Sequence, residues 1–452
     1  MTQPPSPSFT GVLRKLALPV YAPTLLQASA LTAIAPVLPL IALDLGFSVA
    51  AAAALGLITG VLGVLGPVPA GRLITGLGER SAMIITGVVL VAVFAGGWWT
   101  VHDAATHGAG GAHRVGLVAT LLGAGVGQQV WNLGRQSYVG SAVDPRLRAR
   151  AMSTFGGMMR IGQVIGPVLG AGATAWFGDA SVFALAGMLM AAATMTVTVF
   201  LVPVPRGGLP GGGRAPGAAS AADKPARPSS RALLRDPRVR AMAKVALGAA
   251  PLQMARVSRP MVLPLVGAGL GVPAEVISLI FAAAALVEIA LFIPAGTFMD
   301  RYGRAAVLVP CLLMLGFGYV GLAVLATGVG TRSPATGAVV LAVTAAWLAL
   351  GNGLGAGIVM TLGLDLTPEQ DRARHLAVWM TMTGVGPLAG PALVSGISLV
   401  APVAVAGAAI GVLCLGGGLW MLRVLPALTP NPPRGPFHRA APMQPAPGTT
   451  TD

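Results

Sequence analysis

The sequence predicts an all-α membrane protein with twelve transmembrane helices in two pseudo-symmetric six-helix bundles. Three observations predict this fold class. The 452 residues are 55% hydrophobic and only 10% charged, whereas soluble domains carry about 25% charged residues. The apolar residues form long runs, and about 20 such residues cross the hydrocarbon layer of a bilayer. The third observation is an internal repeat at a nearly constant offset.

The apolar runs place six spans in each half of the chain. The spans of the first half are residues 17–44, 50–70, 82–101, 115–140, 151–176 and 181–203. The spans of the second half are residues 241–268, 273–296, 305–327, 336–364, 375–397 and 401–425. Glycine and proline occur within these runs, and membrane helices tolerate both because small residues allow close helix packing.

The positive charge is unevenly distributed between the two sides of the predicted bundle. Connections on one side carry clusters of arginine and lysine, whereas the other side carries only Arg114 and Arg332. By the positive-inside rule, both termini are cytoplasmic and the protein lies in the cell membrane, the inner or plasma membrane. The net charge of +15 does not indicate nucleic-acid binding, because the basic segments lack interleaved aromatic side chains for base stacking.

Composition divides the chain into four parts. Residues 1–203 form the amino-terminal bundle and residues 241–425 the carboxy-terminal bundle. Residues 204–240 form a basic cytoplasmic linker, since the segment is rich in Pro, Gly, Ala and Arg and has too few large apolar residues to fold alone. The Pro-rich residues 426–452 are expected to be a disordered cytoplasmic tail.

The two halves match each other in register. Five short segments recur after 225 or 224 residues, a spacing that residue composition does not explain. They are Val37–Leu40 with Val262–Leu265, Leu45–Gly46 with Leu270–Gly271, Pro69–Gly71 with Pro294–Gly296, Arg148–Arg150 with Arg372–Arg374, and Gly166–Pro167 with Gly390–Pro391. A six-plus-six duplication joined by a basic linker is typical of transporters whose two halves rock about a central site.

A glycine-rich basic motif follows the second span of each half. Residues 296–304 read Gly-Thr-Phe-Met-Asp-Arg-Tyr-Gly-Arg. This segment resembles the signature loop G-x-x-x-D-R-x-G-R of the major facilitator superfamily, and the first half carries a degenerate copy in residues 71–80, with Thr75 and Gly76 in place of Asp and Arg. The resemblance implies that fold and a cytoplasmic gate at the motif residues Gly71, Gly78, Gly296, Asp300, Arg301, Gly303 and Arg304.

A second motif lies in the fifth span. Gly162, Gly166, Pro167 and Gly170 resemble the antiporter motif of proton-coupled exporters in that superfamily. A Gly-Pro pair thins and kinks a helix where two halves slide against each other. The second half contains the related pattern Gly386-x-x-x-Gly390-Pro391. The motif is therefore interpreted either as an exporter signature or as a geometric feature of the repeat.

Two ionisable residues are candidates for proton coupling. Glu288 lies 12 residues before Asp300, and Arg160 lies 10 residues after Arg150, which places them about 18 and 15 Å along their helices. The family architecture implies that the fifth and eighth spans face each other, so Glu288 and Arg160 are expected at similar depth. Because buried acids are functional candidates, we expect Glu288 to bind the coupling proton; the alternative is a fixed structural ion pair.

Other polar residues in the spans predict a positively charged substrate cavity. Arginine side chains can bind an anionic or carbonyl group, and aromatic side chains can stack on a ligand. The alternative is that the arginines pair with Glu288 or Glu275 or bond carbonyls of broken helices, and that the aromatic residues anchor the lipid interface. The cavity candidates are Gln128, Trp131, Asn132, Arg135, Arg256, Arg259 and Trp379, with Tyr138 as a further aromatic residue.

Several other activities are not supported by the sequence. His102, Asp103, His107 and His113 share one external loop without the spacing of a metal site, so no metal is expected. The alternating glycines of residues 351–357 lie inside a span, and no Walker motif is present. An enzyme would need catalytic residues clustered at one membrane face, and no such cluster occurs.

Together these features predict a secondary active transporter, not an enzyme, that works as a monomer in the lipid bilayer by alternating access. The resemblance implies proton-coupled efflux, or antiport, of a small organic compound or drug. The alternative is a proton-coupled uptake symporter for a small metabolite, with anionic metabolites among the candidates. The expected partners are a small-molecule substrate and protons, with no nucleic acid. No cofactor is expected, and the proton gradient is the driving force.

Overall fold

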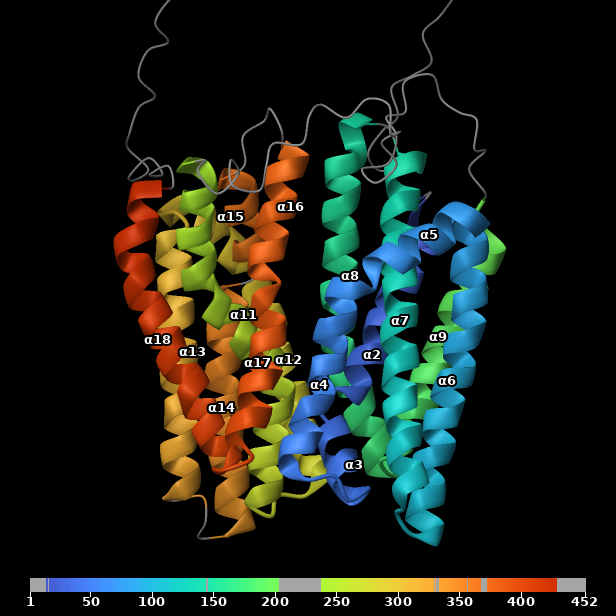
Figure 1. Ribbon diagram of the computed structural model, residues 1–452, viewed down its shortest axis with the longest axis vertical. Coiled ribbons are helices and arrows are strands. Elements are labelled where there is room, and N and C mark those ends of the chain that lie inside the picture. Colours follow the sequence, from blue (N-terminus) through green and yellow to red (C-terminus); the bar gives the residue numbers. More distant parts are fainter. Residues whose placement is uncertain are drawn as a thin grey trace, which may run out of the picture.

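The computed structural model is helical throughout its regular structure and forms two bundles side by side (Figure 1). It describes residues 14, 16–143, 145–202, 237–328, 330, 333–355, 357–366 and 372–428. The predicted tail beyond Leu428 and all but the last four residues of the predicted linker lie outside the described residues. Within the described residues, the predicted all-α fold of two bundles is confirmed.

The amino-terminal bundle contains all the helices before the linker. Its first span is built from three segments and its second from two, which meet at a bend of 54°. The elements are η1 (Ala17–Tyr21), α2 (Ala22–Ile34), α3 (Leu38–Asp44), α4 (Val49–Leu65), α5 (Pro67–Leu77), α6 (Glu79–His107), α7 (Gly111–Ala142), α8 (Pro145–Phe177) and α9 (Ser181–Phe200).

The carboxy-terminal bundle repeats this order. Its elements are α11 (Pro237–Gly269), α12 (Ala274–Tyr302), α13 (Ala305–Thr327), α14 (Pro334–Leu354), α15 (Ile358–Leu366), α16 (Arg372–Thr383), α17 (Val385–Ile397) and α18 (Val403–Leu428). Helix α11 begins at Pro237, within the segment predicted as linker. Proline suits a first helical position because its missing N–H would have no helical partner there.

Only some of the predicted spans are single helices that are long and apolar enough to cross a membrane. Among the described residues, six helices are long and apolar enough to cross a membrane, and seven if the bent pair α4–α5 counts as one span. Other predicted spans are helical but more polar, since α7, α8 and α11 carry the arginines of the candidate site. The outer surface supports lipid as the solvent: Val88 and Phe317 are each 60% exposed, and such apolar side chains are compatible with hydrocarbon.

The sequence repeat is also visible in the backbone. Gly46 and Gly271 have φ of 79° and 71°, and Gly78 and Gly303 have φ of 85° and 89°. Each pair is separated by 225 residues. Positive φ favours glycine because it has no Cβ. The two halves therefore use the same helix-ending turns after their first and second spans.

The two bundles contact each other through α8 with α12 and through α4 with α17. Ser395 Oγ on α17 donates to Ala50 O on α4 at 2.9 Å. Gly56 and Gly60 of α4 lie against Met261 and Leu388 of the other bundle. In Figure 1 the ribbons converge toward α3 and diverge toward α5. We call these two ends of the molecule the α3 end and the α5 end.

Candidate functional site

A hydrogen-bonded chain of polar side chains lies within the carboxy-terminal bundle. Glu288 on α12 accepts hydrogen bonds from Arg259 Nη1 on α11 and from Asn352 Nδ2 on α14, the latter at 2.8 Å. Asn352 Oδ1 in turn accepts from Arg256 Nε at 2.7 Å. Helix α14 approaches α12 closely at Gly353, where a Cβ would lie only 2.9 Å from Leu291 Cβ and 3.4 Å from Glu288 Cα.

The helix break after α14 provides a further acceptor. Helix α14 ends at Leu354, and Arg256 Nη2 donates to Gly355 O at 2.7 Å. Arg256 Nη1 donates to Gln253 Oε1 at 3.3 Å. Arg256 therefore bonds the carbonyl of a broken helix, and Arg259 pairs with Glu288. Both contacts belong to the alternative in which the arginines have partners within the protein. Whether they also bind substrate stays a prediction.

Arg160 of α8 faces this chain from the amino-terminal bundle. Its guanidinium interacts electrostatically with Glu288 and Arg256, and α8 packs against α12. The structure thus brings the two proton-coupling candidates together across the interface between the bundles. Three arginines surround one carboxylate, so this region carries a net positive charge.

A second polar cluster is enclosed in the amino-terminal bundle. Arg135 of α7 is 1% exposed and donates to Asn132 Oδ1 at 3.0 Å, to Trp131 O at 3.1 Å and to Gln27 Oε1. Its guanidinium lies 5.5 Å from the ring centroid of Phe155. None of the described acidic side chains contacts it. Gln128, another cavity candidate on α7, is half-buried.

The aromatic candidates are buried within their bundles. Trp131 is 0% exposed, Trp379 2% and Tyr138 8%. Trp379 Nε1 donates to Val359 O at 3.1 Å, and the ring packs on Gly363. Anchoring at the lipid interface, one alternative considered for these residues, is therefore wrong, because an anchor must be exposed at the membrane surface.

The gate motif is described in part. Gly78 and Gly303 end α5 and α12 at the α5 end of the molecule. Arg304 Nε donates to Asp365 Oδ2 at 2.8 Å, and the Arg301 guanidinium lies 5.4 Å from the Tyr302 ring. Gly71 lies against Leu133 of α7, whereas the side chain of Asp300 and the surroundings of Gly296 fall outside the described part. The predicted latch through Asp300 stays a prediction.

The glycine motif of α8 packs against the first span. A methyl group added at Gly162, Gly166 or Gly170 would lie 2.5 Å from the carbonyl oxygens of Leu25, Ser29 and Ala33, respectively. In the other half, a methyl group added at Gly386 or Gly390 would lie 3.0 Å from Ala250 O or 2.9 Å from Met254 O, respectively. Ala250 and Met254 follow Leu25 and Ser29 by 225 residues. The glycines of this pattern thus have equivalent packing in both halves, and an exporter role for the motif stays a prediction.

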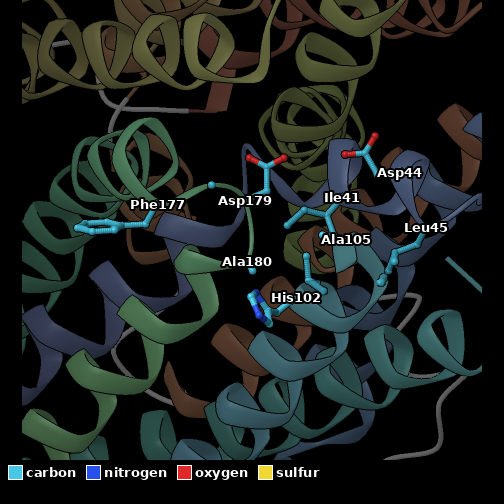
Figure 2. Close-up of a pocket in the computed structure, with 11 residues that line it drawn as sticks. Ile41, Asp44, Leu45, His102, Ala105, Phe177, Asp179 and Ala180 are labelled. Carbon is cyan, nitrogen blue, oxygen red and sulfur yellow. The ribbon is translucent and has the colours of Figure 1, made fainter. Parts of the chain in front are cut away.

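A pocket of about 270 Å³ opens at the α3 end. Figure 2 shows the carboxylates of Asp44 and Asp179 along one side of the pocket and the His102 ring opposite them. Asp179 lies in the turn between α8 and α9, and its pKa is raised by burial first and then by the negative charges of Asp44 and Glu275. Glu275 begins α12, so this acidic group spans both bundles.

The histidines at the junction of α6 and α7 include one residue of this pocket, His102. His102 stacks on Trp98, with 5.1 Å between ring centroids. Asp103 pairs with His107 at 3.0 Å and with His113 at 2.9 Å. Among the described residues, no three His, Cys, Asp or Glu side chains are arranged to hold a metal ion.

Sequence reasoning missed three members of the polar clusters. Gln27, Asn352 and Phe155 contact the key arginines from other helices. Gln27 and Asn352 are amides within apolar spans, and a buried amide needs partners there. That signal was available in the sequence, whereas the position of Phe155 depends on helix packing.

Two helical bundles that meet at buried charged residues define a polytopic membrane transporter. The sequence profile of the Major Facilitator Superfamily matches residues 24–255 and 245–448. The two matches together cover most of the chain and divide it between its two bundles. The protein belongs to the Major Facilitator Superfamily, and it is a transporter, not an enzyme.

Solved structures share the fold at low sequence identity. A POT family transporter in complex with 5-aminolevulinic acid has a TM-score of 0.71 and 13% identity, with 92% of this chain and 97% of that chain covered. A D-xylose-proton symporter has a TM-score of 0.66 and 15% identity, with 93% of this chain and 98% of that chain covered. A peptide transporter POT in complex with sulfate has a TM-score of 0.68 and 14% identity, with 94% of this chain and 97% of that chain covered. A search of curated protein sequences gave no match.

Proposed function

We propose that this protein is a proton-coupled symporter that takes up a small metabolite bearing an anionic group, with Glu288 as the proton-binding residue. The observation that carries this proposal is the position of Glu288. It is held by Arg259 and Asn352 within one bundle and interacts with Arg160 of the other. A charged neighbour changes the proton affinity of a carboxylate. Motion of the bundles that displaces Arg160 would therefore couple proton binding to alternating access.

Two findings favour uptake over efflux. The structural neighbours include a D-xylose-proton symporter and POT transporters crystallised with 5-aminolevulinic acid and with sulfate. Their fold is shared, and proton symport on this fold supports the same coupling here. The exporter interpretation rested on the glycines of α8, and the equivalent packing of Gly386 and Gly390 gives those glycines a structural role in both halves.

An anionic substrate is supported by the charge of the interface. Arg160, Arg256 and Arg259 surround a single carboxylate, Glu288. Buried like charges repel one another unless a counter-charge is present. The net positive charge at the interface would attract an anionic substrate toward the bundles.

Transport into vesicles tests direction and coupling together. Right-side-out and everted membrane vesicles from cells that express the protein would be given labelled lactate, benzoate and, as a neutral comparison, xylose. Symport predicts accumulation into right-side-out vesicles when the outside is acidic. Glu288→Gln should abolish that accumulation and retain exchange of labelled for unlabelled substrate. Glu275→Gln, at the exposed start of the same helix, is the matched control and should transport normally.

The direction of flux separates uptake from efflux. Accumulation in everted vesicles driven by an acidic interior would instead establish antiport. Uphill transport by Glu288→Gln would show that another group binds the proton.

A further inference from the structure

The amino-terminal bundle buries hydrogen-bond donors that the coupling step does not use. Arg135 is 1% exposed, and Gln27 and Trp131 are 2% and 0% exposed. Arg135 Nη1, Gln27 Nε2 and Trp131 Nε1 have no hydrogen-bond partner within the described part of the chain. The three side chains are neighbours, because Arg135 donates to Gln27 Oε1 and its guanidinium lies 5.6 Å from the Trp131 ring centroid.

The cluster also lacks a negative charge. A guanidinium stays protonated in proteins, and burial of an unpaired charge is strongly unfavourable. The acceptors that Arg135 uses are neutral oxygens of Gln27, Asn132 and Trp131. The rings of Trp131 and Phe155 add cation–π attraction, which is weaker than a full counter-charge.

Two arginines of the carboxy-terminal bundle are satisfied differently. Arg259 pairs with the carboxylate of Glu288. Arg256 donates from all three nitrogens, to Asn352, Gln253 and Gly355. Of these three buried arginines, only Arg135 has a nitrogen, Nη1, without a hydrogen-bond partner among the described residues and also contacts none of the described acidic side chains. The difference indicates that its counter-charge comes from outside the described residues.

We propose that Arg135, Gln27 and Trp131 bind the carboxylate of a small monocarboxylate substrate. A carboxylate supplies one negative charge and up to about four acceptor positions, and it accepts side-on hydrogen bonds from arginine. One uncompensated positive charge matches a monoanion. The near-complete burial of all three side chains favours a compact ligand that becomes enclosed. This assignment rests on the proposed transport function and adds the chemical class of its substrate.

The cluster is physically connected to the coupling residues. Phe155, which contacts Arg135, and Arg160, which interacts with Glu288, lie five residues apart on α8. That spacing corresponds to about 7.5 Å along a helix. A carboxylate bound at Arg135 therefore sits beside the helix that carries the interfacial arginine. Movement of α8 on ligand binding would displace Arg160 relative to Glu288.

Binding without a proton gradient tests the site independently of coupling. Purified protein in detergent would be titrated with acetate, lactate and benzoate, with thermal unfolding and calorimetry as readouts. Benzyl alcohol, chloride and sulfate are the comparison probes. The proposal predicts that a monocarboxylate raises the Tm and binds with measurable heat. Benzyl alcohol and sulfate are expected to give no comparable effect.

Two variants place the missing charge inside the protein. Gln27→Glu and Asn132→Asp each put a carboxylate beside Arg135 Nη2, which currently bonds both amides. Both should raise the Tm without ligand, because the buried charge gains a partner, and should weaken monocarboxylate binding about tenfold or more. Gln129→Glu is the control, since Gln129 lies on the same helix against Gly66 of the α4–α5 bend. It should bind the probes as the native protein does.

Each other outcome overturns the assignment. Equal effects of benzyl alcohol and benzoate, binding of chloride or sulfate alone, or unaltered binding by Gln27→Glu would contradict a carboxylate site at Arg135. So would the absence of any response to the three monocarboxylates. Failure of this site leaves symport testable through the Glu288→Gln vesicle experiment. Failure of symport does not alter a binding result obtained without a gradient.

Discussion

The pair between Arg259 and Glu288 leads to a quantitative prediction about stability. Both side chains are 18% exposed, so most of each charge is removed from water. Removing one member of a buried pair leaves an unpaired charge and costs about 3–5 kcal/mol. The residual exposure and the bond from Asn352 place this pair at the lower end. We expect Glu288→Gln or Arg259→Gln to lower the free energy of unfolding by about 3 kcal/mol, or about 150-fold in equilibrium constant.

The double variant isolates the interaction itself. Arg259→Gln/Glu288→Gln removes both charges of the pair, so its loss should not exceed that of either single variant. The coupling energy is then about 3 kcal/mol. The assay is reversible unfolding by SDS titration in mixed micelles, followed by circular dichroism. Glu275→Gln, at an exposed position, should change stability by less than about 0.5 kcal/mol.

An additive result would refute this reasoning. A coupling energy below about 0.5 kcal/mol is what distant, independent sites give. It would show that the two side chains do not interact in the folded protein. The Glu288 network could then not hold the carboxylate in one bundle while Arg160 approaches it from the other.

Three further predictions concern helix packing and the α3 end. Gly166→Ala and Gly390→Ala should each lower stability by about 1–3 kcal/mol in thermal unfolding, because the new Cβ would meet Ser29 O at 2.5 Å or Met254 O at 2.9 Å. Gly157→Ala, with open space around it, should not. Ser395→Ala removes the hydrogen bond to Ala50 O, which contributes about 1 kcal/mol to holding the bundles together. Distances between spin labels should then show an about fivefold larger population that is open at the α3 end. The raised pKa of Asp179 predicts that its protonated form stabilises the closed α3 end at low pH, and that this stabilisation is lost as pH rises through the folded pKa. Asp179→Asn should flatten the profile of Tm against pH from about pH 4 upward.

The positions of the spans were predictable because a long apolar run in lipid satisfies its backbone hydrogen bonds by forming a helix. The run from residue 17 to 44 fits this rule as a whole, although the structure divides it into η1, α2 and α3. The bend at Gly66 was less accessible. A Gly-Pro pair is tolerated in a membrane helix, and only packing decides whether it bends. At that bend, Gly66 packs against the aliphatic part of the Gln129 side chain from α7.

The candidate site was predictable residue by residue but not as a set of contacts. Arg135, Arg256, Arg259 and Glu288 stood out because charges are unfavourable in hydrocarbon. Their partners depend on which helix faces cross, and the sequence does not show that. Asn352 was overlooked among the glycines of α14, yet it bridges Arg256 and Glu288.

The sequence repeat explains the helix packing that the two halves share, and the positions where the halves differ carry the charged residues of the candidate site. Applying the 225-residue offset pairs Glu288 with Gly63, Arg259 with Ile34, and Arg135 with Met360. Each of these charged residues thus corresponds to an uncharged residue at the equivalent position of the other half. The glycine packing of Gly166 and Gly390, by contrast, is shared by both halves. The two bundles can therefore pack and move alike but cannot exchange chemical roles. One bundle holds the acid and the other an arginine without an acid, so an anion and a proton would enter opposite bundles, joined through Arg160 on α8.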